Sequence, residues 1–452
     1  MNWIILIVGG LFFGYALIYK PEIIAVVLFT LVIGEINLFN LRPVIILALF
    51  GRIIIDKKTQ SQYPAFLGIP NVKLLVIFLL YGLFVAFPQD LLNYDLIKGD
   101  IDTVMLTFIM YHFYFKHQNA NELKTALIIS GIICFSDLAY TYIAFGSFPI
   151  HRLYYLFIGG SENLSEESLD AMANWNYFGE ICGMCFIYVL IDYIKNQQAN
   201  KFIVWLLPIM FIGVFMSTSR SSILALLLIS LLVILKGINY KDQKKRIVKI
   251  GVFGIGAVVI GFLMMATVGK YVNLDSKFIE EITDRLSQEP IAMVQKALGQ
   301  SYNINNLGSM DWREESAENA YKAYMNLPFM EQFFGIGAHG FEVRNIGHGY
   351  NAHNALLLLL IENGIAGAFL YFLIVIGTMI QSIIMKNFSP SFYVVGFLLI
   401  YGIAQNREWT GWTAFLFIYC IVAEMQLLRL KRRDHLYSLA LDRAANNKKE
   451  TP

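Results

Sequence analysis

Residues 354–385 read NALLLLLIENGIAGAFLYFLIVIGTMIQSIIM and contain a single charged side chain, Glu362. A helix needs about 20 apolar residues to cross the hydrocarbon core of a bilayer, so this run is long enough to span one. Backbone polar groups must be paired within lipid, and runs of this length are too long for barrel strands, so we expect helices. The candidate spans are the apolar runs at about 2–19, 22–39, 42–55, 72–88, 101–115, 124–146, 172–195, 201–217, 219–236, 247–268, 354–385, 391–404 and 409–428.

The composition of the whole chain is that of a membrane protein. Of 452 residues, 57% are hydrophobic and 15% are charged, whereas an ordinary soluble domain carries about 25% charged residues. These proportions exclude a soluble globular enzyme and a disordered chain. The net charge of +2 gives no reason to expect a nucleic-acid partner. The runs predict 13 spans, or 12 if the short run at 42–55 is re-entrant or merges with a neighbour.

Lysine and arginine side chains fall in alternate connections between the runs. By the positive-inside rule, these connections are cytoplasmic. The other connections are short or acid-rich and are expected outside, which makes the long polar segment before residue 354 external. The sequence therefore predicts an N-terminal transmembrane bundle at 1–268, a periplasmic loop at 269–353, C-terminal transmembrane helices at 354–428 and a basic cytoplasmic tail at 429–452.

Part of the external segment has helical periodicity. Trp312, Ser316, Ala320 and Tyr324 recur at every fourth position, and charged side chains occupy the other faces. This spacing predicts an amphipathic helix that lies on the membrane or on the bundle. Pro328 is expected to end it, because proline cannot continue a helix.

The segment Ser217-Thr-Ser-Arg220-Ser-Ser lies where one apolar run ends and the next begins. Its hydroxyl groups can cap the new helix, but a cation in the first turn is unfavourable against the helix dipole. An anion held by both Arg220 and the helix N-terminus accounts for this placement; the alternative is an arginine that snorkels to the interface. Arg313, on the expected amphipathic helix, either reaches the membrane surface or pairs with acidic neighbours.

A glycine-rich segment at 334–341 precedes His353 and the run that contains Glu362. The glycines mark tight turns, and the absence of a soluble βαβ pattern excludes a nucleotide fingerprint. A helix N-terminus disfavours the imidazolium, so His353 is expected to be neutral near pH 7 and able to accept a proton, unless it is merely interfacial. An ionisable group inside a membrane run is costly, which makes Glu362 a functional candidate.

Together these motifs resemble the bacterial O-antigen ligase and Wzy-type polysaccharide polymerase superfamily. Asn174-Trp-Asn176 is similar to the N-P-N segment of that superfamily. Three departures are Trp175 in place of the usual proline, Ala317 in place of a common aromatic residue, and the additional ionisable Glu180. The matching features are T-S-R at Arg220, Arg313 fifteen residues before Pro328, the G-x-G turn at Gly335 and Gly337, and H-N-x-x-L…E-x-G-x-x-G from His353 to Gly367.

The resemblance implies a GT-C-like fold: an all-α polytopic membrane protein with 12–13 transmembrane helices and one large periplasmic loop containing amphipathic helices. It implies an inverting, metal-independent glycosyltransferase without a cofactor, located in the bacterial inner membrane with its active site facing the periplasm. The implied donor is a glycan on undecaprenyl diphosphate. The implied acceptor is another glycan for a polymerase or a lipid A core for a ligase. Partners in such a system include the lipid bilayer, a chain-length regulator and a flippase.

The residue chemistry agrees with these roles. Arginine forks suit phosphate oxygens, so Arg220 and Arg313 are the candidates for binding the diphosphate. His353 is the candidate base for the attacking sugar hydroxyl. Asn354 and Glu362 are candidates for supporting roles. Arg407 and Glu408 either complete the site or mark an interface.

The sequence also fits other interpretations of two motifs and of the whole chain. Asp100-Ile-Asp102 has the spacing of a metal motif but is equally explained by a helix N-cap. Cys182-Gly-Met-Cys185 has a redox or metal spacing, although buried cysteine also serves as a small packing residue. A non-catalytic scaffold within a glycan assembly complex is another hypothesis for the whole chain. A lipid-linked oligosaccharide flippase or other secondary transporter requires ionisable residues inside spans, which here are Glu35, Asp137 and Glu180.

Overall fold

The computed structural model of the chain describes residues 121–145, 175–195, 204–217, 219–238, 243–252, 309–337, 340–344 and 354–403, together with single positions elsewhere. These residues form helices and turns, and none of them forms a β-strand. The expected all-α class is therefore confirmed for the described part of the chain.

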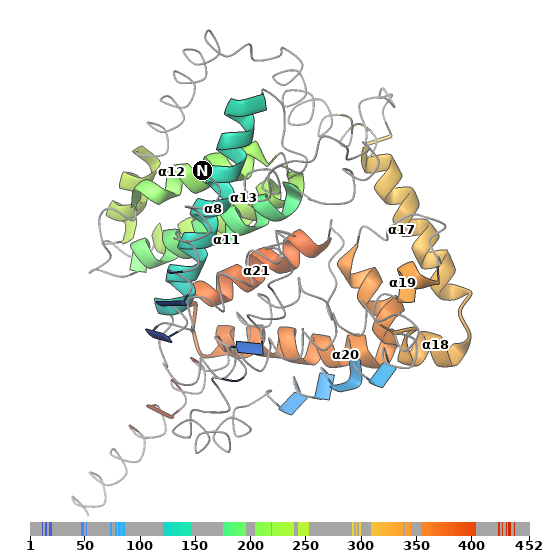
Figure 1. Cartoon of the computed structure of the whole chain (residues 1–452). Coiled ribbons are helices and arrows are strands. Elements are labelled where there is room, and N and C mark those ends of the chain that lie inside the picture. The colour runs from blue at the N-terminus through green and yellow to red at the C-terminus, as the bar shows by residue number, and fades with distance from the viewer. Residues whose placement is uncertain are drawn as a thin grey trace, which may run out of the picture.

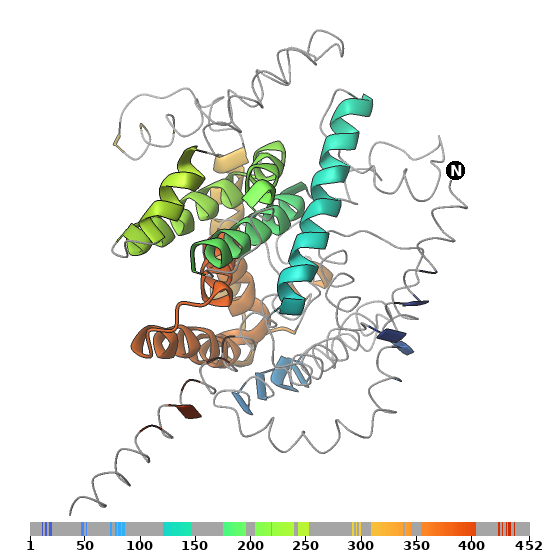
Figure 2. The same cartoon turned by 90° about the vertical axis from the view of Figure 1, so that its left-hand side faces the viewer.

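Four helices form one group with α11 at its centre (Figure 1). Helix α11 packs against α8, α12 and α13, and on a further side against α21. In the second view α8 lies along the edge of this group (Figure 2). Each helix lies on a predicted apolar run and ends within a few residues of it. The bounds are Asn121–Phe145 for α8, Trp175–Lys195 for α11, Leu206–Met216 for α12 and Arg220–Ile238 for α13.

Small residues let α11 approach its neighbours closely. A methyl group added to Gly213 on α12 would lie 2.8 Å from Cys182 Sγ, and one added to Gly131 on α8 would lie 3.0 Å from Cys185 Sγ. Both cysteines are free thiols and fully buried. The interpretation of Cys182 and Cys185 as small packing residues is therefore confirmed.

The apolar run at 354–385 forms helix α20 (Ala355–Ile384), which is followed by a turn and helix α21 (Pro390–Ile403). Helix α21 lies between α20 and the α11–α13 group (Figure 1). Within the described residues, α20 is the one helix that is long and apolar enough to cross a membrane, with a mean hydropathy of 2.1. The helix is interrupted at Gly364, whose φ of 63° and ψ of −175° are not helical.

Three helices of the polar segment gather at the N-terminal end of α20 (Figure 1). The first is α17 (Ser309–Met325), followed by the short helices α18 (Phe329–Phe334) and α19 (Gly340–Val343). The predicted amphipathic face is confirmed, because Ser316, Ala320 and Tyr324 are buried while the acidic positions are exposed. This face packs in one cluster with side chains of α20, so α17 lies on the bundle. The chain turns after Met325, and α18 begins directly after Pro328.

Other predictions fall on parts of the chain outside the described residues. Helical residues 243–252 begin four positions before the predicted run at 247–268. The total number of spans, the domain boundaries and the periplasmic position of the loop stay predictions. The predicted spans that lie largely or wholly outside the described residues are those at 2–19, 22–39, 42–55, 72–88, 101–115, 247–268 and 409–428.

Candidate functional site

The predicted site residues that the structure describes lie at the start of α13, on α17 and in the first part of α20. Arg220 is the first residue of α13, and Arg313 lies in the first half of α17; for both, the structure describes the backbone position only. Asn354 and Glu362 are described in full. The positions outside the described residues are Asp100, Asp102, His353, Arg407 and Glu408.

A cluster of buried serines builds the turn that places Arg220. Ser217 Oγ donates to the carbonyl oxygen of Val214 at 2.7 Å and accepts from the Ser219 N–H at 3.3 Å. Ser219 Oγ accepts from the backbone N–H and from the hydroxyl of Ser222, at 3.4 and 2.8 Å. Serine oxygens therefore cap α13, as the sequence predicts, and fix the backbone of Arg220 at the N-terminus of a helix.

The first turns of α11 close directly onto this serine turn. A methyl group added to Gly179 would lie 2.2 Å from Ser217 Oγ and 3.1 Å from Ser222 Oγ, so only glycine fits. Gly179 is three residues after Asn176, which belongs to the segment resembling the N-P-N motif. The structure thus brings the start of α11 and the start of α13 to the same end of the helix group.

The two glycine motifs of the C-terminal part pair with each other. We define the glycine clasp as residues 335–337 together with residues 361–364. The Ile336 N–H donates to the Ile361 carbonyl oxygen at 3.1 Å, and the Gly337 N–H donates to the Glu362 carbonyl oxygen at 2.9 Å. The non-helical Gly364 interrupts α20 at this point, where these two carbonyls accept from the G-x-G turn.

Glycine is required at both sides of the clasp. Gly335 has a φ of 88°, and a methyl group there would lie 2.1 Å from the Glu362 carbonyl oxygen. A methyl group on Gly364 would lie 2.4 Å from the Gly335 nitrogen and from the Phe333 carbonyl oxygen. The G-x-G and E-x-G-x-x-G motifs, which the sequence presents separately, therefore form one tight backbone joint between α18 and α20.

Tyr81, from a distant part of the chain, holds both sides of this joint. Its hydroxyl lies 2.5 Å from the Phe334 carbonyl oxygen and 3.0 Å from the Asn363 carbonyl oxygen. Its ring faces Gly367, where an added methyl group would lie 2.8 Å from a ring carbon. Tyr81 and Asn363, whose Cβ would lie 2.5 Å from the same methyl group, together explain why the last glycine of the E-x-G-x-x-G motif must be small.

Replacement of Tyr81 by phenylalanine is expected to weaken the joint. The Tyr81→Phe protein loses the hydroxyl that bridges two carbonyl groups, which costs about 1–2 kcal/mol of unfolding free energy. The measurement is the unfolding midpoint of the purified protein in detergent. Tyr19→Phe is the matched control, because the Tyr19 side chain is 65% exposed. Equal midpoints for the two variants would contradict the bridging role.

Helix α17 carries Arg313 and packs on α20. Its buried face includes Ser316 and Ala320, which lie three and seven positions after Arg313 in the sequence. Below them, burial raises the pKa of Tyr324, whose hydroxyl donates to the Gln332 carbonyl oxygen at 3.1 Å. This neutral contact ties α17 to α18, so the helix that carries Arg313 is joined to the glycine clasp.

Asn354 and Glu362 both belong to the first segment of α20. The Asn354 side-chain oxygen accepts from the N–H groups of Leu356 and Leu357, each at 3.0 Å, and so caps the helix. His353 immediately precedes this cap in the sequence. Glu362 is 2% exposed and lies two residues before Gly364. Both candidates thus sit between the helix start and the clasp.

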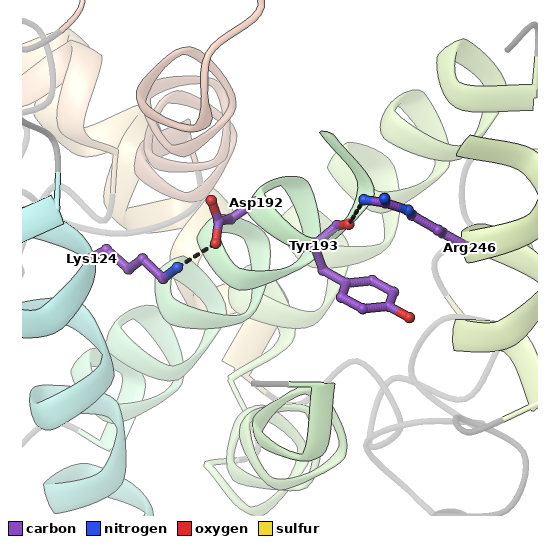
Figure 3. Close-up of polar contacts among 4 residues, drawn as sticks. All are labelled: Lys124, Asp192, Tyr193 and Arg246. Atoms are coloured by element: carbon purple, nitrogen blue, oxygen red, sulfur yellow. Dashed lines mark hydrogen bonds and ion pairs between the residues drawn. The ribbon is translucent and has the colours of Figure 1, made fainter. Parts of the chain in front are cut away.

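Basic side chains gather at the opposite end of the helix group. Lys124 pairs with Asp192, and Arg246 Nη1 donates to the Tyr193 carbonyl oxygen at 2.8 Å (Figure 3). The neighbouring Lys195 donates to the Phe388 carbonyl oxygen at the turn between α20 and α21. This end is therefore well separated from the serine turn, since α11 runs from one to the other.

Metal-ligating side chains do not cluster in the described ranges. Across those ranges, no group of three or more histidine, cysteine, aspartate or glutamate side chains is placed to hold a metal ion. Sequence reasoning missed two other residues that position the site, Tyr81 and Gly179. Neither carries a local signal, because each is a common residue within an apolar run and acts through a partner distant in sequence.

Comparison with known proteins agrees with the motifs. No curated protein matches the chain. Residues 205–372, which include Arg220, Arg313, the glycine clasp and His353, match the family described as O-antigen ligase. That family consists of membrane proteins. The match supports a glycan-transfer function of the kind carried out by a glycosyltransferase-like enzyme. The match over residues 205–372 confirms the expected resemblance to the superfamily of O-antigen ligases and polysaccharide polymerases.

Proposed function

We propose that this protein transfers or polymerises a glycan from an undecaprenyl-diphosphate-linked donor at the periplasmic face of the bacterial inner membrane. The observation that carries the proposal is the family match over residues 205–372, because it covers both candidate arginines and the candidate histidine. Two observations support it: serine hydroxyl groups cap the helix that begins at Arg220, and α17, the helix that carries Arg313, packs on α20.

The proposed reaction is a single displacement at the anomeric carbon of the donor sugar. The acceptor hydroxyl oxygen bonds to this carbon while the bond from the carbon to the phosphate oxygen breaks, which inverts the configuration. The hydroxyl proton passes to the neutral imidazole of His353. The electron pair of the broken bond stays on the departing undecaprenyl diphosphate. Guanidinium groups of Arg220 and Arg313 stabilise this developing charge, so no metal is needed.

The charge at the two ends of the helix group supports the proposed orientation. Lys124, Lys195 and Arg246 lie at the end opposite the serine turn. Under the positive-inside rule the basic end faces the cytoplasm. The serine turn, the start of α20 and helices α17–α19 then face the periplasm, where the lipid-linked donor is presented.

The test is glycan transfer by the full-length protein reconstituted in liposomes. The substrates are an undecaprenyl-diphosphate-linked oligosaccharide as donor, and either a second donor molecule or lipid A core as acceptor. The assay measures release of undecaprenyl diphosphate in buffer with EDTA. The Arg220→Ala protein is expected to lose about 100-fold in rate, because a fixed group that stabilises the leaving charge is removed. Arg220→Lys keeps the charge but not the fork, and should recover only part of the rate.

Arg433→Ala is the matched control, since the Arg433 side chain is 75% exposed and pairs only with its sequence neighbour Asp434 among the described contacts. Its rate should equal that of the wild type. If the wild-type protein moves the donor between leaflets without releasing undecaprenyl diphosphate, the protein is a flippase and the proposal is wrong. Equal rates for Arg220→Ala and Arg433→Ala would remove Arg220 from the site.

A further inference from the structure

Helix α18 exposes its apolar side chains, unlike an ordinary surface helix. Its four large apolar side chains are exposed, and none of its residues is buried. Its two polar side chains are half-buried and bond to other parts of the protein: Glu331 pairs with Arg344 at 3.0 Å, and Gln332 donates to the carbonyl oxygens of Met325 and Leu327. The exposed side chains, which we call the α18 patch, are Phe329, Met330, Phe333 and Phe334.

The α18 patch is a continuous aromatic surface. The rings of Phe329 and Phe333 stack with centroids 6.2 Å apart, and those of Phe333 and Phe334 meet edge to face at 5.0 Å. Phe329 is 73% exposed and Met330 is 62% exposed. A water-exposed protein surface rarely collects four large apolar side chains within six residues, so this surface calls for an apolar partner.

Helix α20 carries an apolar stripe that begins next to this patch. The glycine clasp fixes Phe333 against Gly364, and the exposed Ile365 follows at once. The stripe continues at helical spacing along one side of α20, and every member is a large apolar side chain. Its members are Ile365, Phe369, Phe372, Leu373, Ile376, Ile380, Ile383 and Ile384.

The length of the stripe identifies the medium that covers it. The 20 residues from Ile365 to Ile384 form a helix about 30 Å long. This length equals the hydrocarbon thickness of a bilayer, about 30 Å. The interruption at Gly364 therefore marks one edge of the hydrocarbon core, and the clasp holds the α18 patch at that edge. Phenylalanine is among the side chains that form the apolar face of helices lying at this level.

We propose that α18 is an interfacial membrane anchor, whose α18 patch inserts into the headgroup and acyl boundary of the leaflet next to the candidate site. The occupant of this surface is lipid. Its continuity with the stripe of α20 favours lipid over a protein partner. Glu331 and Gln332 favour lipid as well, because their polar groups already bond within the protein and a protein partner would be expected to meet a polar rim on the helix. The anchor does not depend on the chemistry proposed for Arg220 and His353.

The test measures the depth of a spin label on the full-length protein in nanodiscs of phosphatidylcholine and phosphatidylglycerol. A nitroxide is attached to Met330→Cys or, separately, to Phe329→Cys, after the four native cysteines are replaced by alanine or serine. Collision with oxygen and with a water-soluble nickel chelate gives the depth. Both labels are expected about 5–10 Å below the lipid phosphates, the depth of interfacial helices.

Two matched positions set the scale. Lys322→Cys, on the polar face of α17, should be fully accessible to the nickel chelate, and Phe369→Cys, on the stripe of α20, should be accessible only to oxygen. Labels at 329 and 330 that behave like the label at 322 would overturn the anchor. Labels shielded from both reagents, or coupled to a second label in nanodiscs holding two copies, would overturn it in favour of a protein contact.

Discussion

Gly364→Ala is expected to destabilise the protein by at least about 3 kcal/mol, because two costs add. The backbone of Gly364 has φ 63° and ψ −175°, a region that residues with a side chain rarely enter. The new methyl group would also lie 2.4 Å from two backbone atoms of the facing segment. Neither atom belongs to a flexible side chain, so α18 must move away and the hydrogen bonds of the glycine clasp break.

The measurement combines unfolding in detergent with the transfer assay. Gly377→Ala is the matched control, because Gly377 lies in the same helix and a methyl group there meets nothing within 4 Å. That variant should keep or slightly raise the stability, since alanine favours a helix over glycine by about 1 kcal/mol. If Gly364→Ala unfolds at the same midpoint as Gly377→Ala, the clasp does not contribute to stability as described.

His353→Ala is expected to lower the rate of glycan transfer by about 100- to 10,000-fold, the usual contribution of a positioned general base. Binding of the donor should change little, because the arginines hold the diphosphate. The wild-type rate should fall as the pH is lowered through the pKa of the imidazole, since only the neutral form accepts a proton. The variant should lose this acidic limb of the pH–rate profile.

His348→Ala is the matched control, a histidine five residues earlier in the same segment to which no role is assigned. Its rate and pH profile should equal those of the wild type. Single-turnover release of undecaprenyl diphosphate separates the chemical step from product release. Retention of the acidic limb in His353→Ala would assign the titrating base to another residue.

Features encoded locally could be predicted from the sequence. The buried face of α17 was predicted because Ser316, Ala320 and Tyr324 repeat with the helical period. The start of α13 was predicted because serines that cap a helix precede an apolar run. The free, buried state of Cys182 and Cys185 followed from their place within such a run.

Features that depend on pairing between distant segments could not be predicted. The sequence showed Gly335 and Gly364 as separate turn signals, and only the fold reveals that each makes room for the backbone of the other. Tyr81 acts through two carbonyl oxygens that lie more than 250 residues away in the chain. A hydroxyl within an apolar run has many possible partners, so its position in the sequence does not select one.

The contacts of α11 also bear on where the proposed lipid-linked donor can enter. Methyl groups added to Gly179 and Gly183 on α11, or to Gly131 and Gly213 on its neighbours, would come within 3.0 Å of an atom across the interface. At these positions the adjacent helices are too close to α11 to accommodate even one added methyl group without a shift. Helix α11 is therefore closely packed on its neighbours, and under the proposed function we expect the polyprenyl tail of the donor to enter away from it.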